Sequence, residues 1–189
     1  MRVETDMARF NSPAELEVWR SELAATHDPN HPCVTVCGGT GCRVYGSEQV
    51  WEAFRDQVVR QGASATVNLK VKATGCHGFC EKGPLVVIRP QGIFYTRVKV
   101  EDVPEIVAET IMGGRVVERL LYTDPRSGVK IEHEHDVPFY KHQHRLVLDL
   151  NGELDPSQID EYIARGGYAS LEKALTDMSP EQVIAQVKA

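Results

Sequence analysis

Residues 33–42, CVTVCGGTGC, predict a short strand that runs straight into a glycine-rich loop. The strand comprises Val34 to Val36. Cys37 follows it directly, and Cys42 comes after four more residues, three of which are glycine. We therefore expect two thiols to lie close to the end of a strand.

A second stretch repeats this design. Residues 75–80, GCHGFC, carry Cys76 and Cys80 with three residues between them. They follow a strand that alternating apolar residues predict for positions 66–72. Since both loops follow strands, we expect them to meet at the same end of a sheet, where four sulfurs converge.

Around these loops, residues 33–114 are interpreted as β-α-β-β-β-α. A helix capped by Ser47 presents apolar side chains on one face, namely Val50, Trp51, Phe54 and Val58. A hairpin follows, with strands at 85–88 and 93–98, and a last helix ends at Gly113-Gly114. This order is that of a thioredoxin-like domain, so the expected fold class is α/β.

An N-terminal helical arm is expected over residues 1–32. Ser12-Pro13-Ala14-Glu15 is a capping box with proline at the first helical position. Two further prolines, at 29 and 32, make a stiff connector to the domain. The arm is expected either to contact another subunit or to pack on this chain.

Residues 115–189 predict a linker and an α-rich extension. We expect a strand over 145–150 and capping boxes at Asp155 and Ser179, each opening a helix. About 75 residues with little strand content bury little surface by themselves. The extension should therefore pack on something else or begin a larger domain.

The composition limits the class of protein. Of 189 residues, 42% are hydrophobic and 25% charged, which argues against wholesale disorder and a fibrous repeat. A net charge of −6 argues against a broad nucleic-acid surface. We see no apolar run of the roughly 20 residues that a membrane span needs and no secretory signal. We expect a cytoplasmic chain whose five cysteines are thiols or thiolates rather than disulfides.

Four converging thiolates match a [2Fe-2S] cluster, which needs two for each iron. Zinc is the main alternative, although structural zinc sites usually pair ligands at hairpin spacings of about two to four residues. Neighbouring glycines would let backbone N–H groups approach the sulfurs, and Arg43, His77 and Lys82 would add positive potential. No Cys-x-x-Cys dithiol is present.

Three nearby residues are expected to support the site without binding metal. Cys33 lies four residues before Cys37 on a strand, roughly 13 Å away, which is too far to share one iron. We interpret it as a buried strand residue. His77 is expected to be a polar neighbour that tunes the potential, and Phe79 to shield the site from water or simply to pack.

The cysteine motifs, CGGTGC at 37–42 and GCHGFC at 75–80, resemble those of the thioredoxin-like [2Fe-2S] ferredoxin family, which includes the small iron–sulfur subunit of respiratory complex I. The resemblance implies that Cys37, Cys42, Cys76 and Cys80 hold the cluster. It implies one-electron transfer rather than substrate chemistry on this chain, so whether the chain counts as an enzyme is left open.

Later residues resemble a different protein, the opening of the flavin-carrying, NADH-oxidising subunit of complex I-like enzymes. The matching runs are VPFYKHQHR at 137–145, DEYIARGGY at 160–168 and LEKAL at 171–175. Fusion of the two is typical of the diaphorase subunits of NAD-linked hydrogenases and formate dehydrogenases. The resemblance therefore implies a subunit of an NAD(P)-linked multisubunit oxidoreductase.

One departure from that pattern concerns the cofactors. In the family, the loop that binds FMN and NADH follows the helix that begins here at Ser179, and the chain ends at Ala189. We expect a truncated form of a longer subunit or a natural short protein. FMN, NAD and a [4Fe-4S] cluster are expected only in the remainder of a parent subunit.

The expected partners are the flavin and iron–sulfur subunits of such an enzyme, and a homodimer is a further candidate. Neither nucleic acid nor a membrane span is expected. The alternative function is a zinc-stabilised docking module without redox activity. His133, His135, His142 and His144 suggest a metal site or, more simply, a polar surface segment.

Overall fold

The computed structural model describes residues 10, 12–28, 30–61 and 68–189. These residues form two compact units. One comprises Asp28–Ser157, and the other joins the chain up to His27 with Gln158–Ala189. The four cysteines of the two motifs all belong to the first unit.

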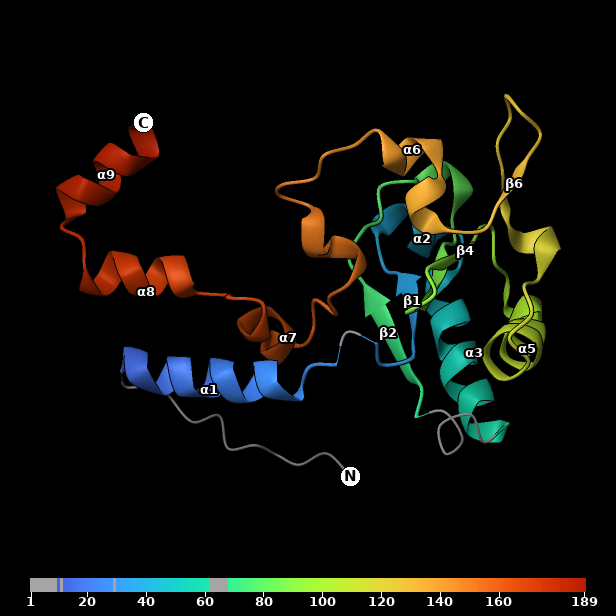
Figure 1. The fold of residues 1–189 in the computed structure, drawn as a ribbon, viewed down its shortest axis with the longest axis horizontal. Coiled ribbons are helices and arrows are strands. Elements are labelled where there is room, and N and C mark those ends of the chain that lie inside the picture. Colours follow the sequence, from blue (N-terminus) through green and yellow to red (C-terminus); the bar gives the residue numbers. More distant parts are fainter. Residues whose placement is uncertain (1–9, 11, 29, 62–67) are drawn as a thin grey trace. The chain divides into compact units, whose positions relative to one another are not determined.

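A four-stranded sheet forms the centre of the first unit (Figure 1). Its strands, in the order β2-β1-β3-β4, are β1 (Cys33–Cys37), β2 (Lys70–Thr74), β3 (Val86–Arg89) and β4 (Ile93–Tyr95). β1 and β2 are parallel, whereas β1 with β3 and β3 with β4 are antiparallel. Helices and sheet together confirm the α/β prediction.

Helices cover one face of this sheet. They are α3 (Ser47–Arg60), η2 (Val100–Asp102), α5 (Val103–Glu105) and the π-helix η3 (Ile106–Met112). The predicted apolar face of α3 is confirmed, since Val50, Phe54 and Val58 are buried in a core with Val34 and Val36 of β1. Side chains of a strand alternate between faces, so Cys37 belongs to the other side of the sheet.

A second core forms on that other side. It joins Cys37, Cys42 and Phe79 to Val87 and Phe94 of the sheet and to Tyr122 and Val137 from later in the chain. The later elements are η4 (Glu118–Leu120), β5 (Tyr122–Thr123), β6 (Lys130–Ile131), η5 (Glu134–Asp136), α6 (Pro138–Lys141) and η6 (Asp149–Gly152). Phe94 N donates to Glu132 O at 2.8 Å, and Glu134 N donates to Gly92 O at 3.0 Å. Residues between 118 and 137 thus pack against the sheet.

Several local predictions in this unit differ from the structure, among them the strand expected over 93–98, which ends at Tyr95. The strand expected over 145–150 is wrong: Leu146 and Val147 are 78% and 92% exposed, and no sheet neighbour pairs with them. Ser47 is not the cap of α3, because Gly46, at φ +89°, is the N-cap and Ser47 is buried in the first turn. The strand expected over 66–72 begins at Lys70, and its residues 66 and 67 lie outside the described residues.

Helices make up the second unit: α1 (Pro13–Thr26), α7 (Ile159–Ala164), α8 (Ala169–Thr176) and α9 (Pro180–Lys188). The caps predicted at Ser12 and Ser179 are confirmed, since both side chains accept from a backbone N–H three residues on. Asp155 does not open a helix, because it accepts from Ser157 N at 2.9 Å in a turn and α7 begins four residues later.

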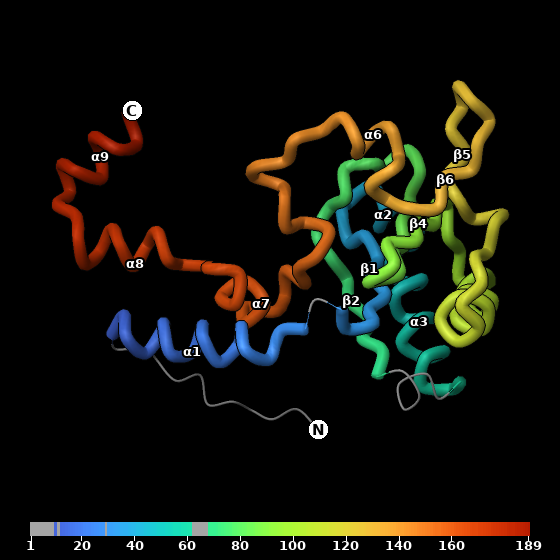
Figure 2. The backbone as a smooth tube through the Cα atoms, viewed as in Figure 1, coloured from blue at the N-terminus to red at the C-terminus, as the bar shows by residue number. Residues whose placement is uncertain are grey.

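The N-terminal helix packs within this unit. α1 runs beside α7 (Figures 1 and 2), and Trp19 Nε1 donates to Asp160 Oδ1 at 3.3 Å. Arg20 pairs with Glu172 of α8 at 3.5 Å. The arm therefore contacts its own chain. Across the described residues, no helix combines the length and the apolar character required to cross a membrane.

Candidate metal centre

The parallel pairing of β1 and β2 brings the two cysteine loops together. Cys37, the last residue of β1, is in register with Thr74, the last residue of β2. Gly38 N donates to Thr74 O at 2.9 Å just beyond this pair. Because parallel strands end at the same edge, the loops that follow them start side by side.

Short helices then position the remaining thiols. The first loop is shorter than expected, since α2 (Thr40–Val44) begins inside it and carries Cys42. The second loop ends in the 3₁₀-helix η1 (Cys80–Lys82), which begins at Cys80. The structure thus brings all four predicted site cysteines to one edge of the sheet.

The four thiols fall into two pairs whose members affect each other's ionisation. The Cys42 thiol lowers the pKa of Cys37, whereas burial chiefly raises the pKa of Cys76 and Cys80 adds to that rise. The charge of a Cys37 thiolate also raises the pKa of Cys76 across the two loops. Two thiols per pair, with both pairs in electrostatic contact, match the donor set of a two-iron cluster.

Glycines leave the room that this arrangement needs. A Cβ atom on Gly39 would lie 2.9 Å from Cys76 Sγ, and one on Gly41 would lie 3.0 Å from Cys80 Sγ. Gly83 is tighter still, with 2.6 Å to Cys42 Sγ. Side chains at these positions would occupy the space around the sulfurs. Because the three residues are glycines, that space stays open, and we call them the glycine cradle. The open space and the four thiols fit a [2Fe-2S] group.

Burial differs across the set. Cys37 and Cys42 are buried, Cys76 is half-buried and Cys80 is exposed. Cys33 is also buried, on β1, and its Sγ lies 3.7 Å from Val34 O. Its burial agrees with the interpretation of Cys33 as a strand residue.

Backbone amides stabilise thiolate at these positions. The pKa of Cys37 is lowered chiefly by a hydrogen bond from the Cys42 thiol, against the effect of burial, and further by backbone N–H groups of His77 and Gly39. The same hydrogen bond, with burial and the Cys37 charge, raises the pKa of Cys42. Without metal, one buried thiolate therefore opposes the ionisation of the next, and cationic iron would remove that opposition.

His77 is a buried polar residue of the second loop. Its Nδ1 donates to Glu134 Oε1 at 2.9 Å, and its Nε2 lies 2.9 Å from Thr74 Oγ1. Arg89 Nη2 donates to the other oxygen of Glu134, also at 2.9 Å. Both ring nitrogens are thus engaged, which supports the role of polar neighbour rather than ligand.

Two residues of this environment escaped the sequence analysis. Glu134 lies in a histidine-rich stretch interpreted as surface, and Arg145 was noted as the end of a resembling run and the start of a predicted strand, not as part of the site. Arg145 Nη2 donates to the backbone oxygen of His77 at 2.7 Å. The sequence offered one signal, a histidine between two motif cysteines; the structure shows that it is buried and therefore needs polar partners.

Aromatic side chains close the same side. Phe79 is buried and stacks on Phe139, with ring centroids 4.4 Å apart and an interplanar angle of 5°. Tyr140 meets the edge of Phe79 at 5.9 Å. Phe79 is therefore part of an apolar wall beside Cys80.

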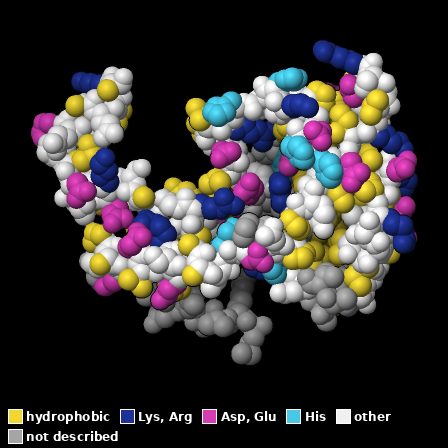
Figure 3. All heavy atoms as spheres, viewed as in Figure 1, with side chains coloured by type: hydrophobic (Ala, Val, Ile, Leu, Met, Phe, Trp, Pro, Cys, Tyr) yellow, Lys and Arg dark blue, Asp and Glu magenta, His cyan; other side chains and the backbone are white. Residues whose placement is uncertain are grey.

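Among the described residues, no three His, Cys, Asp or Glu side chains are arranged around a single ion, the four cysteines included. A [2Fe-2S] cluster requires two thiolates at each iron rather than three or four at one. His133 and His135 stack on each other at 5.5 Å, and histidine side chains lie on the visible surface around α6 (Figure 3).

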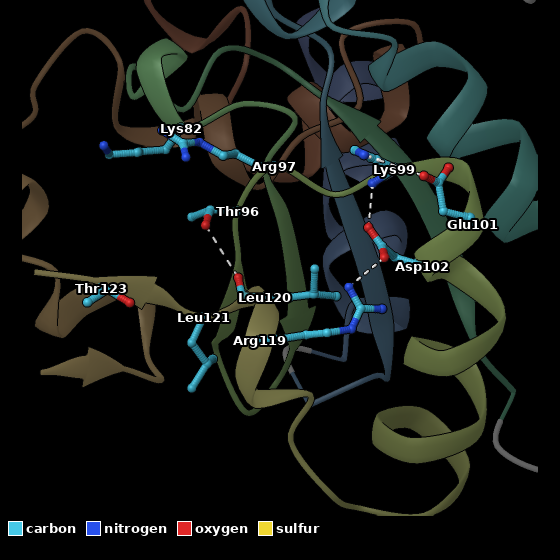
Figure 4. Close-up of a pocket in the computed structure, with 10 residues that line it drawn as sticks. All are labelled: Lys82, Thr96, Arg97, Lys99, Glu101, Asp102, Arg119, Leu120, Leu121 and Thr123. Atoms are coloured by element: carbon cyan, nitrogen blue, oxygen red, sulfur yellow. Dashed lines mark hydrogen bonds and ion pairs between the residues drawn. The ribbon is translucent and has the colours of Figure 1, made fainter.

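A cavity of about 520 Å³ lies beside η1 but contains none of the cysteines (Figure 4). Lys82 and Arg97 line it on one side, and Asp102 pairs with Arg119 at 2.7 Å on the other. Lys82 and Lys99, two more of its cations, pair with Glu81 at 2.7 Å and with Glu101 at 3.5 Å.

Comparisons with known proteins agree with this geometry. A family model described as thioredoxin-like [2Fe-2S] ferredoxin matches residues 25–110. The 2Fe-2S ferredoxin of Clostridium pasteurianum is 37% identical over 103 residues, covering 49% of this chain and 96% of the relative. That of Aquifex aeolicus (strain VF5) is 37% identical over 93 residues, covering 49% and 78%.

A different relative is similar over a shorter stretch. A subunit of the NADH-quinone oxidoreductase of Salmonella typhimurium is 40% identical over 45 residues, which cover 24% of this chain and 10% of that protein. The ferredoxin matches are the extensive ones, and they include nearly all of the clostridial protein. The chain therefore belongs to the thioredoxin-like [2Fe-2S] ferredoxin family.

Proposed function

We propose that this chain carries single electrons on a [2Fe-2S] cluster held by Cys37, Cys42, Cys76 and Cys80. The observation that supports this most is the meeting of two thiol pairs, from separate loops, among glycines that leave room around the sulfurs. The names of the ferredoxin relatives point the same way.

The protein would supply position and electrostatics, while the cluster, when bound, supplies the change of oxidation state. Backbone N–H groups directed at Cys37 and Cys76 would offset the negative charge of the thiolates. The exposed Cys80 is the ligand nearest to solvent, so an electron partner would approach from its side.

The wider setting is an NAD(P)-linked multisubunit oxidoreductase in the cytoplasm. Similarity to part of an NADH-quinone oxidoreductase supports this setting. On this proposal, residues 1–32 are an arm, 33–114 the ferredoxin domain and 115–189 the start of a flavoprotein-type domain. FMN, NAD and a [4Fe-4S] cluster would belong to other parts of the enzyme, and flavin and iron–sulfur subunits would be the partners.

Spectroscopy of the purified full chain, made or reconstituted without oxygen, tests the electron-carrier role. We expect a red-brown protein with equal amounts of iron and acid-labile sulfide, visible absorption that dithionite bleaches, and an EPR signal on reduction. A colourless protein with stoichiometric zinc would instead support the docking module without redox activity.

A mixing experiment tests the enzyme setting. NADH alone should leave the absorption of the oxidised cluster unchanged, and a catalytic amount of the flavoprotein subunit of an NAD-linked reductase should make NADH bleach it. Bleaching that is no faster than with free FMN would contradict this setting while leaving the electron-carrier role intact.

A further inference from the structure

A covering segment, which we define as residues 134–152, lies over the second cysteine loop. It follows the residues that the family model matches, which end at 110. Glu134 holds the ring of His77, and Phe139 stacks on Phe79. A Cβ on Gly75 would lie 2.9 Å from the backbone oxygen of Asn151, so the end of the segment also touches the loop.

Arg145 is a charged residue of this segment whose side chain hydrogen bonds to the backbone of the second cysteine loop. Its Nη2 donates to the backbone oxygen of His77 at 2.7 Å. Its guanidinium carbon lies 4.8 Å from the centre of the Tyr140 ring, and its Nε donates to Gln143 Oε1 at 3.4 Å. Arg145 is only partly exposed, so solvent screens its charge less than that of a surface arginine.

The peptide group that Arg145 binds also contacts a candidate ligand. The oxygen of His77 and the N–H of Gly78 belong to the same peptide group. That N–H donates to Cys76 Sγ at 3.3 Å. Gly78 has φ +85°, in the left-handed region, where a residue with a Cβ would be strained. One peptide group thus links the guanidinium to the sulfur.

A cation at the oxygen of a peptide group polarises that group and strengthens the hydrogen bond that its N–H donates. Hydrogen bonds to the cluster sulfurs and nearby positive charge both favour the reduced, more negative state of a cluster. Arg145 provides both effects at Cys76.

We propose that Arg145 is a positioning residue that raises the reduction potential of the cluster through the peptide group of His77 and Gly78. This inference rests on the proposed function, since it requires a cluster at Cys76. On this proposal the covering segment both packs against the second cysteine loop and adjusts the reduction potential of the cluster.

The test is a redox titration of the full chain, followed by EPR, with the variant Arg145→Gln. We expect its cluster to be harder to reduce, with the one-electron equilibrium shifted by about tenfold, equal to a fall of about 59 mV. Arg145→Lys keeps the positive charge but not the planar guanidinium group. The reduction potential of this variant should therefore fall by less than that of Arg145→Gln.

Arg126→Gln is the matched control, because it removes the same charge from the exposed turn between β5 and β6. Its potential should equal that of the wild type. An Arg145→Gln potential that is unchanged, or shifted no more than in the control, would overturn the proposal. If Arg145→Gln retains no cluster, Arg145→Met decides: a potential below that of the control supports the proposal, and an unchanged potential refutes it.

A second readout follows the hydrogen bond itself. The exchangeable Gly78 amide proton should couple to the reduced cluster in pulsed EPR, and Arg145→Gln should weaken this coupling. A purely structural role for Arg145 would lower stability but leave coupling and potential unchanged. A wild-type protein without any cluster would refute the proposed function instead, so the two failures are distinguishable.

Discussion

The imidazole of His77 and the carboxylate of Glu134 hydrogen bond in the interior of the protein, with 2.9 Å between Nδ1 and Oε1. Burial acts to raise the pKa of Glu134, but the hydrogen bond and charge of His77, together with Arg89, outweigh burial and hold that pKa below its ordinary value. Glu134 is therefore an ionised residue that connects β3 to the loop of Cys76.

Glu134→Gln should lower the free energy of unfolding at pH 7 by about 1–3 kcal/mol, because His77 and Arg89 lose a charged acceptor. Since folding lowers the pKa of Glu134, its stabilisation is complete above the unfolded value of about 4.3 and is lost as pH falls through the folded value. Urea denaturation of the cluster-free protein should show the gap between wild type and variant narrowing below about pH 4. A gap that widens with acid would contradict this account.

The ligand assignment predicts opposite results for two buried cysteines of the same strand, β1. Cys37→Ser should abolish or alter the cluster, and Cys76→Ser on the second loop should do the same. Cys33→Ser should retain a wild-type EPR signal, because its thiol lies outside the four-cysteine group. Loss of the cluster in Cys33→Ser with retention in Cys37→Ser would show that the ligand set is wrong.

Gly39→Ala should reduce cluster occupancy, because its methyl group would lie 2.9 Å from Cys76 Sγ. The comparison is Gly92→Ala in the β3–β4 turn, where φ is +76° and a methyl group meets nothing within 4 Å. That variant should lose about 1 kcal/mol of stability from backbone strain and keep its cluster. Iron and sulfide analysis of both variants measures the cluster occupancy. Equal occupancy in the two would contradict the idea that Gly39 keeps space open for the cluster.

Phe139→Ala should make the cluster more accessible to solvent, because it removes the ring stacked on Phe79. The stack contributes about 0.5–1.5 kcal/mol, so we expect roughly a two- to tenfold faster loss of absorption in the presence of a chelator. Phe139→Tyr keeps the stack and serves as the control. Identical rates in all three proteins would assign no shielding to this pair.

Local patterns predicted the part of the structure that depends on local order. Alternating and helical apolar spacing located β1 and the core face of α3, and the placement of both cysteine pairs after strands predicted their meeting at one edge. The same kind of pattern failed at 145–150. There an apolar run resembles a strand, but Val147 is exposed and finds no strand to pair with.

The surroundings of His77 could not be predicted in this way. Glu134 is 57 residues from His77 in sequence, and Arg145 is 68 residues away. No periodicity connects positions so far apart, because these contacts depend on how the later residues of the same unit return to the second cysteine loop. The sequence predicted His77 as a polar neighbour of the cysteines, but neither its burial nor the identity of its partners.

The contact of Arg145 with the backbone of His77 brings a residue from outside the matched family region into the surroundings of the cysteines. On the proposal made above, a gene fragment that stops at residue 114 would encode all four motif cysteines and still give a carrier of lower potential. An insertion or deletion between positions 115 and 144 would likewise change the midpoint potential without altering a cysteine.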